Sequence, residues 1–111
     1  MKDMLEKVEL VAAVRRWLAD RSQELSATGF VSELTESPED RDPGSVWLVL
    51  ESDSTIAEVI VWTNGLIDAK SINVETSEVV EMHREVGETF QVIALIDKLP
   101  GLPSAGDTSA L

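Results

Sequence analysis

His83 is the residue best suited to proton chemistry, because it is the only histidine in the chain. A Ser-His-Asp triad needs an imidazole held against its nucleophile, and any general base must lie within hydrogen-bond reach of the proton that it removes. His83 alternates with Glu81 and Glu85, which puts all three side chains on one face of an extended segment. This spacing holds no nucleophile beside the ring, so the pattern favours an exposed strand histidine over a catalytic base.

The carboxylates are the second candidate for chemistry, since the chain has 21 aspartates and glutamates. Glycosidases use paired carboxylates, but at this abundance such pairs arise by chance. The run Glu39-Asp40-Arg41-Asp42 lacks the central glycine and the terminal glutamate of a calcium loop. The sequence has no cysteine, no His-x-x-x-His pair and no glycine-rich phosphate loop. We therefore expect no catalytic residue, no metal, no cofactor and no enzymatic activity.

The charge balance points to a partner instead. The acids outnumber 9 lysines and arginines and give a formal net charge of −12. From Ser22 to Ala69 the single base is Arg41, and the acids are Glu24, Glu33, Glu36, Glu39, Asp40, Asp42, Glu51, Asp53, Glu58 and Asp68. Such a field repels nucleic acid and anionic lipid and accelerates encounter with basic surfaces. The alternative is acidity that serves solubility alone.

The length of 111 residues is typical of one domain with one modest core. We place this domain at residues 1–101 and a flexible tail, rich in Pro, Gly and Ser, at residues 102–111. Charged residues interrupt the N-terminal segment, and no run approaches the ~20 apolar residues of a membrane span. Together with the absence of cysteine, this predicts a cytoplasmic protein.

The elements that position these side chains begin with an amphipathic helix over residues 3–27. Its predicted apolar stripe is Met4, Val8, Val11, Val14, Leu18 and Leu25. Trp17 lies at the margin of this stripe and is expected in the core, whereas Ala13 falls on the opposite face. Strands are predicted at 30–35, 45–52, 55–63 and 79–86, and a second helix at 89–99. The charged, proline-containing segment 37–44 reads as an exposed loop.

The hairpin around Thr63-Asn64-Gly65 is the most informative local pattern. A three-residue loop with Gly65 in the left-handed region sets Ile60 opposite Asp68 and Glu58 opposite Lys70. The same register sets Trp62 opposite Leu66 and Ile56 opposite Ile72. The reverse face then collects Ala57, Val59, Val61, Ile67, Ala69 and Ser71. Because that face is uniformly small and apolar, we expect the helices to cover it.

The predicted fold is therefore α+β, with an antiparallel meander of four to five strands and both helices on one face. The other face stays open. We predict that it binds a partner through Trp47, Glu51, Glu58, Ile60, Trp62, Asp68, Glu81 and His83, since tryptophan is enriched at binding hot spots. Two alternatives remain: a tryptophan packed beneath a loop or the tail, or binding through the acidic loop from Glu36 to Asp42.

Four segments carry a resemblance to a known family. They are Val14-Arg15-Arg16-Trp17-Leu18, Gly29-Phe30-Val31, Val46-Trp47-Leu48-Val49-Leu50-Glu51 and the hairpin from Ala57 to Asp68. The chain resembles, over about residues 5–99, the small immunity proteins of bacterial polymorphic-toxin systems. The nearest type is TriTu, the cognate of a toxin that ADP-ribosylates elongation factor Tu. The resemblance implies a protein that docks on the catalytic domain of its toxin and occludes it.

Two other classes of binding protein have the same size and charge. An acidic secretion chaperone would hold an extended effector segment, and such chaperones usually dimerise and offer apolar grooves. A plain regulatory or scaffolding domain is the third class. We expect a monomer when the protein is free, which would argue against the chaperone.

Overall fold

The computed structural model describes residues 2–38 and 43–103, with side chains from Glu9 onward. Along the chain the elements are α1 (Lys2–Ala27), β1 (Val31–Glu36), β2 (Ser45–Glu51), β3 (Thr55–Trp62), β4 (Leu66–Asn73), β5 (Val79–Glu85) and α2 (Thr89–Asp97). The strands form one five-stranded antiparallel sheet in the order β1-β2-β3-β4-β5. The predicted α+β meander is confirmed, with strand ends shifted by a residue or two.

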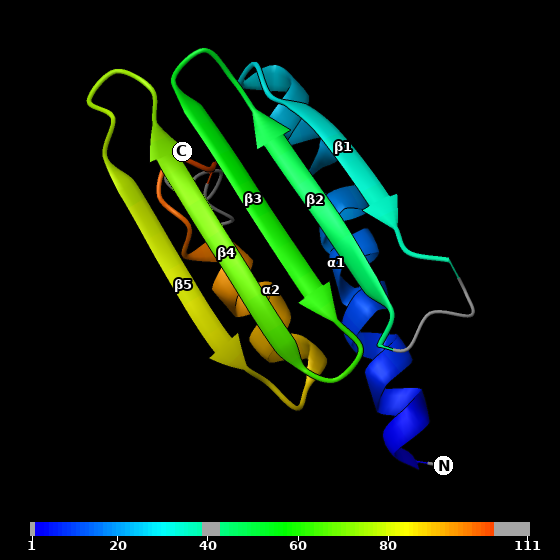
Figure 1. Cartoon of the computed structure of the whole chain (residues 1–111). Helices are drawn as coiled ribbons and strands as arrows, with labels where there is room; N and C mark the ends of the chain where they lie inside the picture. The colour runs from blue at the N-terminus through cyan, green and yellow to red at the C-terminus, as the bar shows by residue number, and fades with distance from the viewer. Residues whose placement is uncertain (1, 39–42, 104–111) are drawn as a thin grey trace.

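The molecule has two layers, as Figure 1 shows. Helix α1 lies behind β1, β2 and β3, and α2 lies beside it behind β4 and β5, so both helices cover the same face of the sheet. Neither α1 nor α2 covers the remaining face. This arrangement follows from the apolar alternation of the central strands, since Val46, Leu48 and Leu50 of β2 all point to the helices and are fully buried.

The β3–β4 hairpin has the predicted register. Glu58 pairs with Lys70 and Ile60 with Asp68, and the small apolar side chains of the reverse face are buried. Gly65 has φ +95°, and a Cβ there would lie 2.5 Å from the carbonyl oxygen of Val86. Glycine is therefore required at this turn both by the backbone angle and by the close approach of the chain after β5.

One prediction about α1 is wrong. Ala13 was expected to face solvent but is completely buried, whereas Leu18 is only half-buried. The reason is that α1 packs against α2 as well as the sheet, which turns the buried stripe toward the side of Ala13, Trp17 and Arg21. Trp17 is in the core as expected. The side chains of Met4 and Val8 lie outside the described set.

A polar cluster ties α1 to α2 and to the segment that follows. The Nε1–H of Trp17 donates to Asp97 Oδ1 at 2.9 Å, and Arg21 Nη2 donates to the same oxygen at 2.6 Å. Arg21 Nη1 also donates to the carbonyl of Pro103 at 3.1 Å. Each buried polar group therefore has a partner, as burial requires.

The chain after α2 returns along the sheet. The hydroxyl of Ser71 donates to the carbonyl of Pro100 at 2.6 Å, and Leu99 is buried beside the core. Leu102 and Pro103, the first residues of the predicted tail, are half-buried. Residues 104–111 of that tail and residues 39–42 of the predicted acidic loop lie outside the described part of the chain.

Candidate interaction surface on the open sheet face

The open face is the side of the sheet turned away from α1 and α2. It is built by alternate residues, because successive strand side chains point to opposite sides and the intervening residues of β2, β3 and β4 are buried under the helices. Cross-strand pairing aligns its side chains in rows. One row runs Trp47, Ile60, Asp68, His83 across four strands, and the next runs Val49, Glu58, Lys70, Glu81.

The structure places all eight predicted binding residues on this face. Trp47 is 45% exposed, and Glu51, Glu81 and His83 are exposed as well. The other four, Glu58, Ile60, Trp62 and Asp68, are half-buried. Both tryptophans therefore lie on the open face, Trp47 exposed and Trp62 half-buried near Pro43.

His83 occupies the exposed position that its strand alternation predicted. Its side chain is 68% exposed. Since a carboxylate can only accept, the ring Nδ1–H donates to Asp68 Oδ1 at 2.6 Å, while Nε2 lies 3.8 Å from Glu81 Oε2. The imidazole thus joins two surface carboxylates. Among residues 2–38 and 43–103, no group of three or more His, Cys, Asp or Glu residues is arranged to hold a metal ion.

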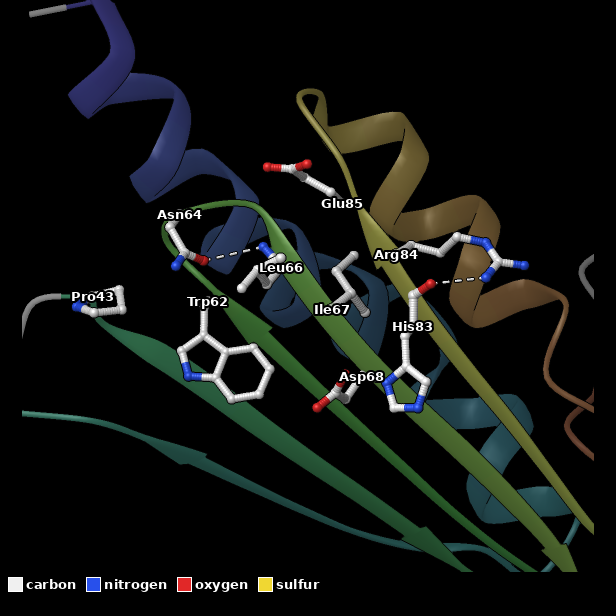
Figure 2. A pocket seen from close by; sticks show the side chains of 9 residues that line it. All are labelled: Pro43, Trp62, Asn64, Leu66, Ile67, Asp68, His83, Arg84 and Glu85. Carbon is white, nitrogen blue, oxygen red and sulfur yellow. Dashed lines mark hydrogen bonds and ion pairs between the residues drawn. The ribbon is translucent and has the colours of Figure 1, made fainter.

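Two hollows indent the open face. The larger, of about 430 Å³, lies at the end of the sheet near the β3–β4 turn and is called here the Trp62 hollow. Its walls include Pro43, Trp62, Asn64, Leu66, Asp68, His83 and Glu85 (Figure 2). A smaller hollow of about 140 Å³ shares Asp68 and His83 and extends to Glu58 and Glu81. Both hollows therefore lie where aromatic or apolar side chains are next to carboxylates.

The open face carries most of its charge as carboxylates. Its acids are Glu33, Glu51, Glu58, Asp68, Glu81 and Glu85, and its one lysine is Lys70. The arginines of α1 lie on the other layer, where Arg15 pairs with Glu36 at 3.0 Å and Arg21 pairs with Asp97 at 2.6 Å. On the helix side the arginines thus offset neighbouring acids, whereas the carboxylates of the open face are largely unbalanced.

Leu66 and Glu85 were absent from the predicted binding set, although both line the Trp62 hollow. Leu66 is 46% exposed and pairs across the strands with Glu85. The hairpin register already set Leu66 opposite Trp62, so that pairing was the signal that could have found it. Asn64 shapes the same turn, because its Oδ1 accepts a bond from the backbone N–H of Leu66 at 3.2 Å.

The sequence matches one protein family over most of its length. The family model for "Immunity protein TriTu" matches residues 12–100, which span most of α1, the whole sheet and α2. The chain belongs to the TriTu immunity protein family. Comparison with curated proteins and with solved structures finds no match. The resemblance noted in the sequence is confirmed.

Membership of the TriTu family gives the chain an immunity function, with a toxin as its partner. Immunity proteins are in general not enzymes. Among the described residues, neither helix is long and apolar enough to cross a membrane.

Proposed function

We propose that this TriTu family member neutralises its toxin by laying the open sheet face over the toxin's catalytic domain. One observation carries the proposal: both helices cover one side of the sheet, and the bare side carries Trp47, Trp62 and Leu66 among carboxylates. Aromatic and aliphatic anchors surrounded by polar groups are the usual composition of a binding surface.

The toxin is expected to present a basic surface. The net charge of −12, to which the open face contributes six acids and one lysine, favours a positively charged partner. Opposite charges at the rim speed the encounter and fix the orientation, while the apolar anchors are the source of most of the affinity. A basic catalytic domain thus finds both parts of a specific interface on this face.

The enzymatic class of the toxin is inferred from the family resemblance. The type member is the cognate of a toxin that ADP-ribosylates elongation factor Tu, and we infer an ADP-ribosyltransferase here too. The partner-binding residues are Trp47, Glu51, Glu58, Ile60, Trp62, Asp68, Glu81 and His83, now joined by Leu66 and Glu85. Binding takes place in the cytoplasm, where such a toxin finds its target.

The test uses the toxin domain encoded by the neighbouring reading frame. Its ADP-ribosylation activity is measured with increasing amounts of the immunity protein, and growth is followed in cells expressing both proteins. We expect inhibition that is complete at equimolar protein, and protection of the cells. An immunity protein that leaves the purified toxin unbound and fully active would contradict the proposal.

The secretion-chaperone alternative is tested by the oligomeric state. A chaperone of this size would be a dimer with an apolar groove, whereas we expect a monomer when the protein is free. Size-exclusion chromatography with light scattering compares the measured mass with the 12.1 kDa of one chain. A stable dimer formed through the open face would favour the chaperone instead.

A further inference from the structure

The residues that line the Trp62 hollow are suited to binding a cationic side chain. Figure 2 shows the indole of Trp62 on one side, with its flat face toward the open side of the sheet, and Asp68 and His83 on the other side. Leu66 adds an aliphatic wall and Glu85 a second carboxylate. An aromatic face with carboxylates beside it favours a cation.

The same combination occurs elsewhere in this molecule with its cation in place. The guanidinium of Arg21 lies 5.6 Å from the centre of the Trp17 ring, and its Nη2 donates to Asp97 at 2.6 Å. Trp17, Arg21 and Asp97 form an aromatic, guanidinium and carboxylate set. The Trp62 hollow repeats the aromatic and the carboxylate, with Trp62 and Asp68.

The cations nearest in the fold are directed elsewhere. Arg84 of β5 also lines the hollow, but its Nη1 donates to the backbone carbonyl of His83 at 2.9 Å. Figure 2 shows its guanidinium pointing away from Trp62 and Asp68. Lys70 lies in the neighbouring row, between Glu58 and Glu81. Within the described residues Glu85 has no ion-pair partner. In the same part of the chain, neither Arg84 nor Lys70 forms an ion pair with Asp68 or Glu85.

Arginine is a better occupant than lysine. Its planar guanidinium stacks on an aromatic face and donates in a fork that matches a carboxylate, whereas lysine presents a compact, strongly hydrated charge. The bond from His83 occupies one oxygen of Asp68, and a carboxylate has about four acceptor sites. Asp68 can therefore accept from His83 and from a guanidinium together.

We infer that the Trp62 hollow binds an arginine side chain of the toxin, stacked on Trp62 and bonded to Asp68 and Glu85. This inference rests on the proposed function, since it names the toxin group that the open face receives. Binding of this arginine in the hollow would fix how the toxin is oriented on the open face. The charged residues outside the hollow then act mainly on the rate of encounter.

A double-mutant cycle tests the inference with the toxin domain of the neighbouring reading frame. Each surface arginine and lysine of the toxin is replaced by Gln in turn, and affinities are measured against wild type, Trp62→Ala and Asp68→Asn. We expect one toxin arginine whose loss weakens binding to wild type by about tenfold or more, and much less to either variant. Replacing that arginine by lysine should restore only part of the affinity.

The matched controls lie on the same face outside the hollow. Trp47→Ala and Glu51→Gln remove the same kinds of group, and their effects should be additive with loss of the toxin arginine. Thermal melting shows whether Trp62→Ala folds. If it does not, Trp62→Phe, which keeps an aromatic ring at the position, replaces it in the cycle. Arg41→Gln in the immunity protein tests its own loop arginine, and we expect undiminished affinity for the toxin.

The possible outcomes separate the inference from the proposed function. Toxin that does not bind the wild-type protein overturns both. If the toxin binds the wild-type protein, but loss of every toxin arginine is additive with Trp62→Ala and with Asp68→Asn, the arginine inference alone is overturned. Coupling to a toxin lysine, or a loss of affinity in Arg41→Gln equal to that in Trp62→Ala, overturns it too. Coupling confined to one toxin arginine and to the residues of the hollow establishes it.

Discussion

Trp62 is the proposed anchor of the binding surface. It is half-buried on the open face, in contact with the hollow and away from the core beneath the helices. Its partner across the sheet, Ser45, is small, and Leu66 on the other side of the turn is itself exposed. The position therefore offers a direct test of the proposed site.

We expect Trp62→Ala to lose about 30- to 1,000-fold in affinity for the toxin, the cost of truncating an aromatic anchor by ~2–4 kcal/mol. Folding should be nearly unchanged, because the core lies on the opposite side of the sheet. Calorimetry or surface binding gives the affinity, and thermal melting gives the stability. A variant that melts far below wild type would place Trp62 in the core. One that folds and still protects cells fully would move the site, most plausibly to the acidic loop from Glu36 to Asp42.

At the scale of elements, strand β2 separates the two roles of the sheet residue by residue. Leu48 points to the helices and is fully buried, and its neighbour Val49 is half-buried on the open face. Alternation predicted both orientations, because the two faces of a strand differ by a single step. The two positions therefore allow a direct comparison.

Leu48→Ala should lower the free energy of unfolding by about 2–5 kcal/mol, the range for emptying a packed core site. Val49→Thr should cost much less, since its side chain already meets solvent. Denaturant unfolding of both variants measures the difference. Equal losses at the two positions would contradict the assignment of the strand faces.

The β3–β4 turn depends on glycine for two reasons that can be separated. Gly65→Ala places a Cβ against the carbonyl of Val86 at φ +95°, whereas Gly29→Ala has a similar φ of +87° with open space around the Cβ. We expect Gly29→Ala to cost about 1–2 kcal/mol from the backbone angle alone, and Gly65→Ala to cost clearly more. Denaturant melts of the pair would show this. Similar costs would mean that the approach of Val86 is easily relieved.

For the whole molecule, the largely unbalanced carboxylates of the open face predict steered association. Raising the ionic strength from ~0.01 M to ~0.15 M shortens the Debye length from about 30 Å to about 8 Å. The on-rate for the toxin should therefore fall several-fold, while the off-rate changes little. Stopped-flow binding at several salt concentrations measures both rates.

Two double variants with equal net charge test which acidic residues steer the association. Glu51→Gln with Glu81→Gln neutralises two acids of the open face, and Glu9→Gln with Asp20→Asn neutralises two exposed acids of α1. The first pair should slow association and flatten its salt dependence more than the second. An on-rate indifferent to salt would remove steering from the account.

The sequence by itself determined the class of fold, the strand faces and the hairpin register. These are local properties. Strand side chains alternate with a period of two, and the length of the turn at Gly65 fixes which residues of β3 and β4 pair. The same alternation was enough to gather the eight predicted binding residues on one face, and their role there is the proposal that the toxin experiments test. The family resemblance was likewise carried by contiguous segments.

Only the tertiary structure decided what depends on packing between distant segments. The contact of α1 with α2 rotated the buried stripe onto Ala13, which the helical period alone placed in solvent. The ion pair between Arg21 and Asp97 joins residues far apart in sequence, and no local pattern announces it. The Trp62 hollow arises in the same way, because Pro43, the hairpin and β5 meet there from separate parts of the chain. A period fixes the direction of a side chain, but what lies beside it is set by the packing of the elements.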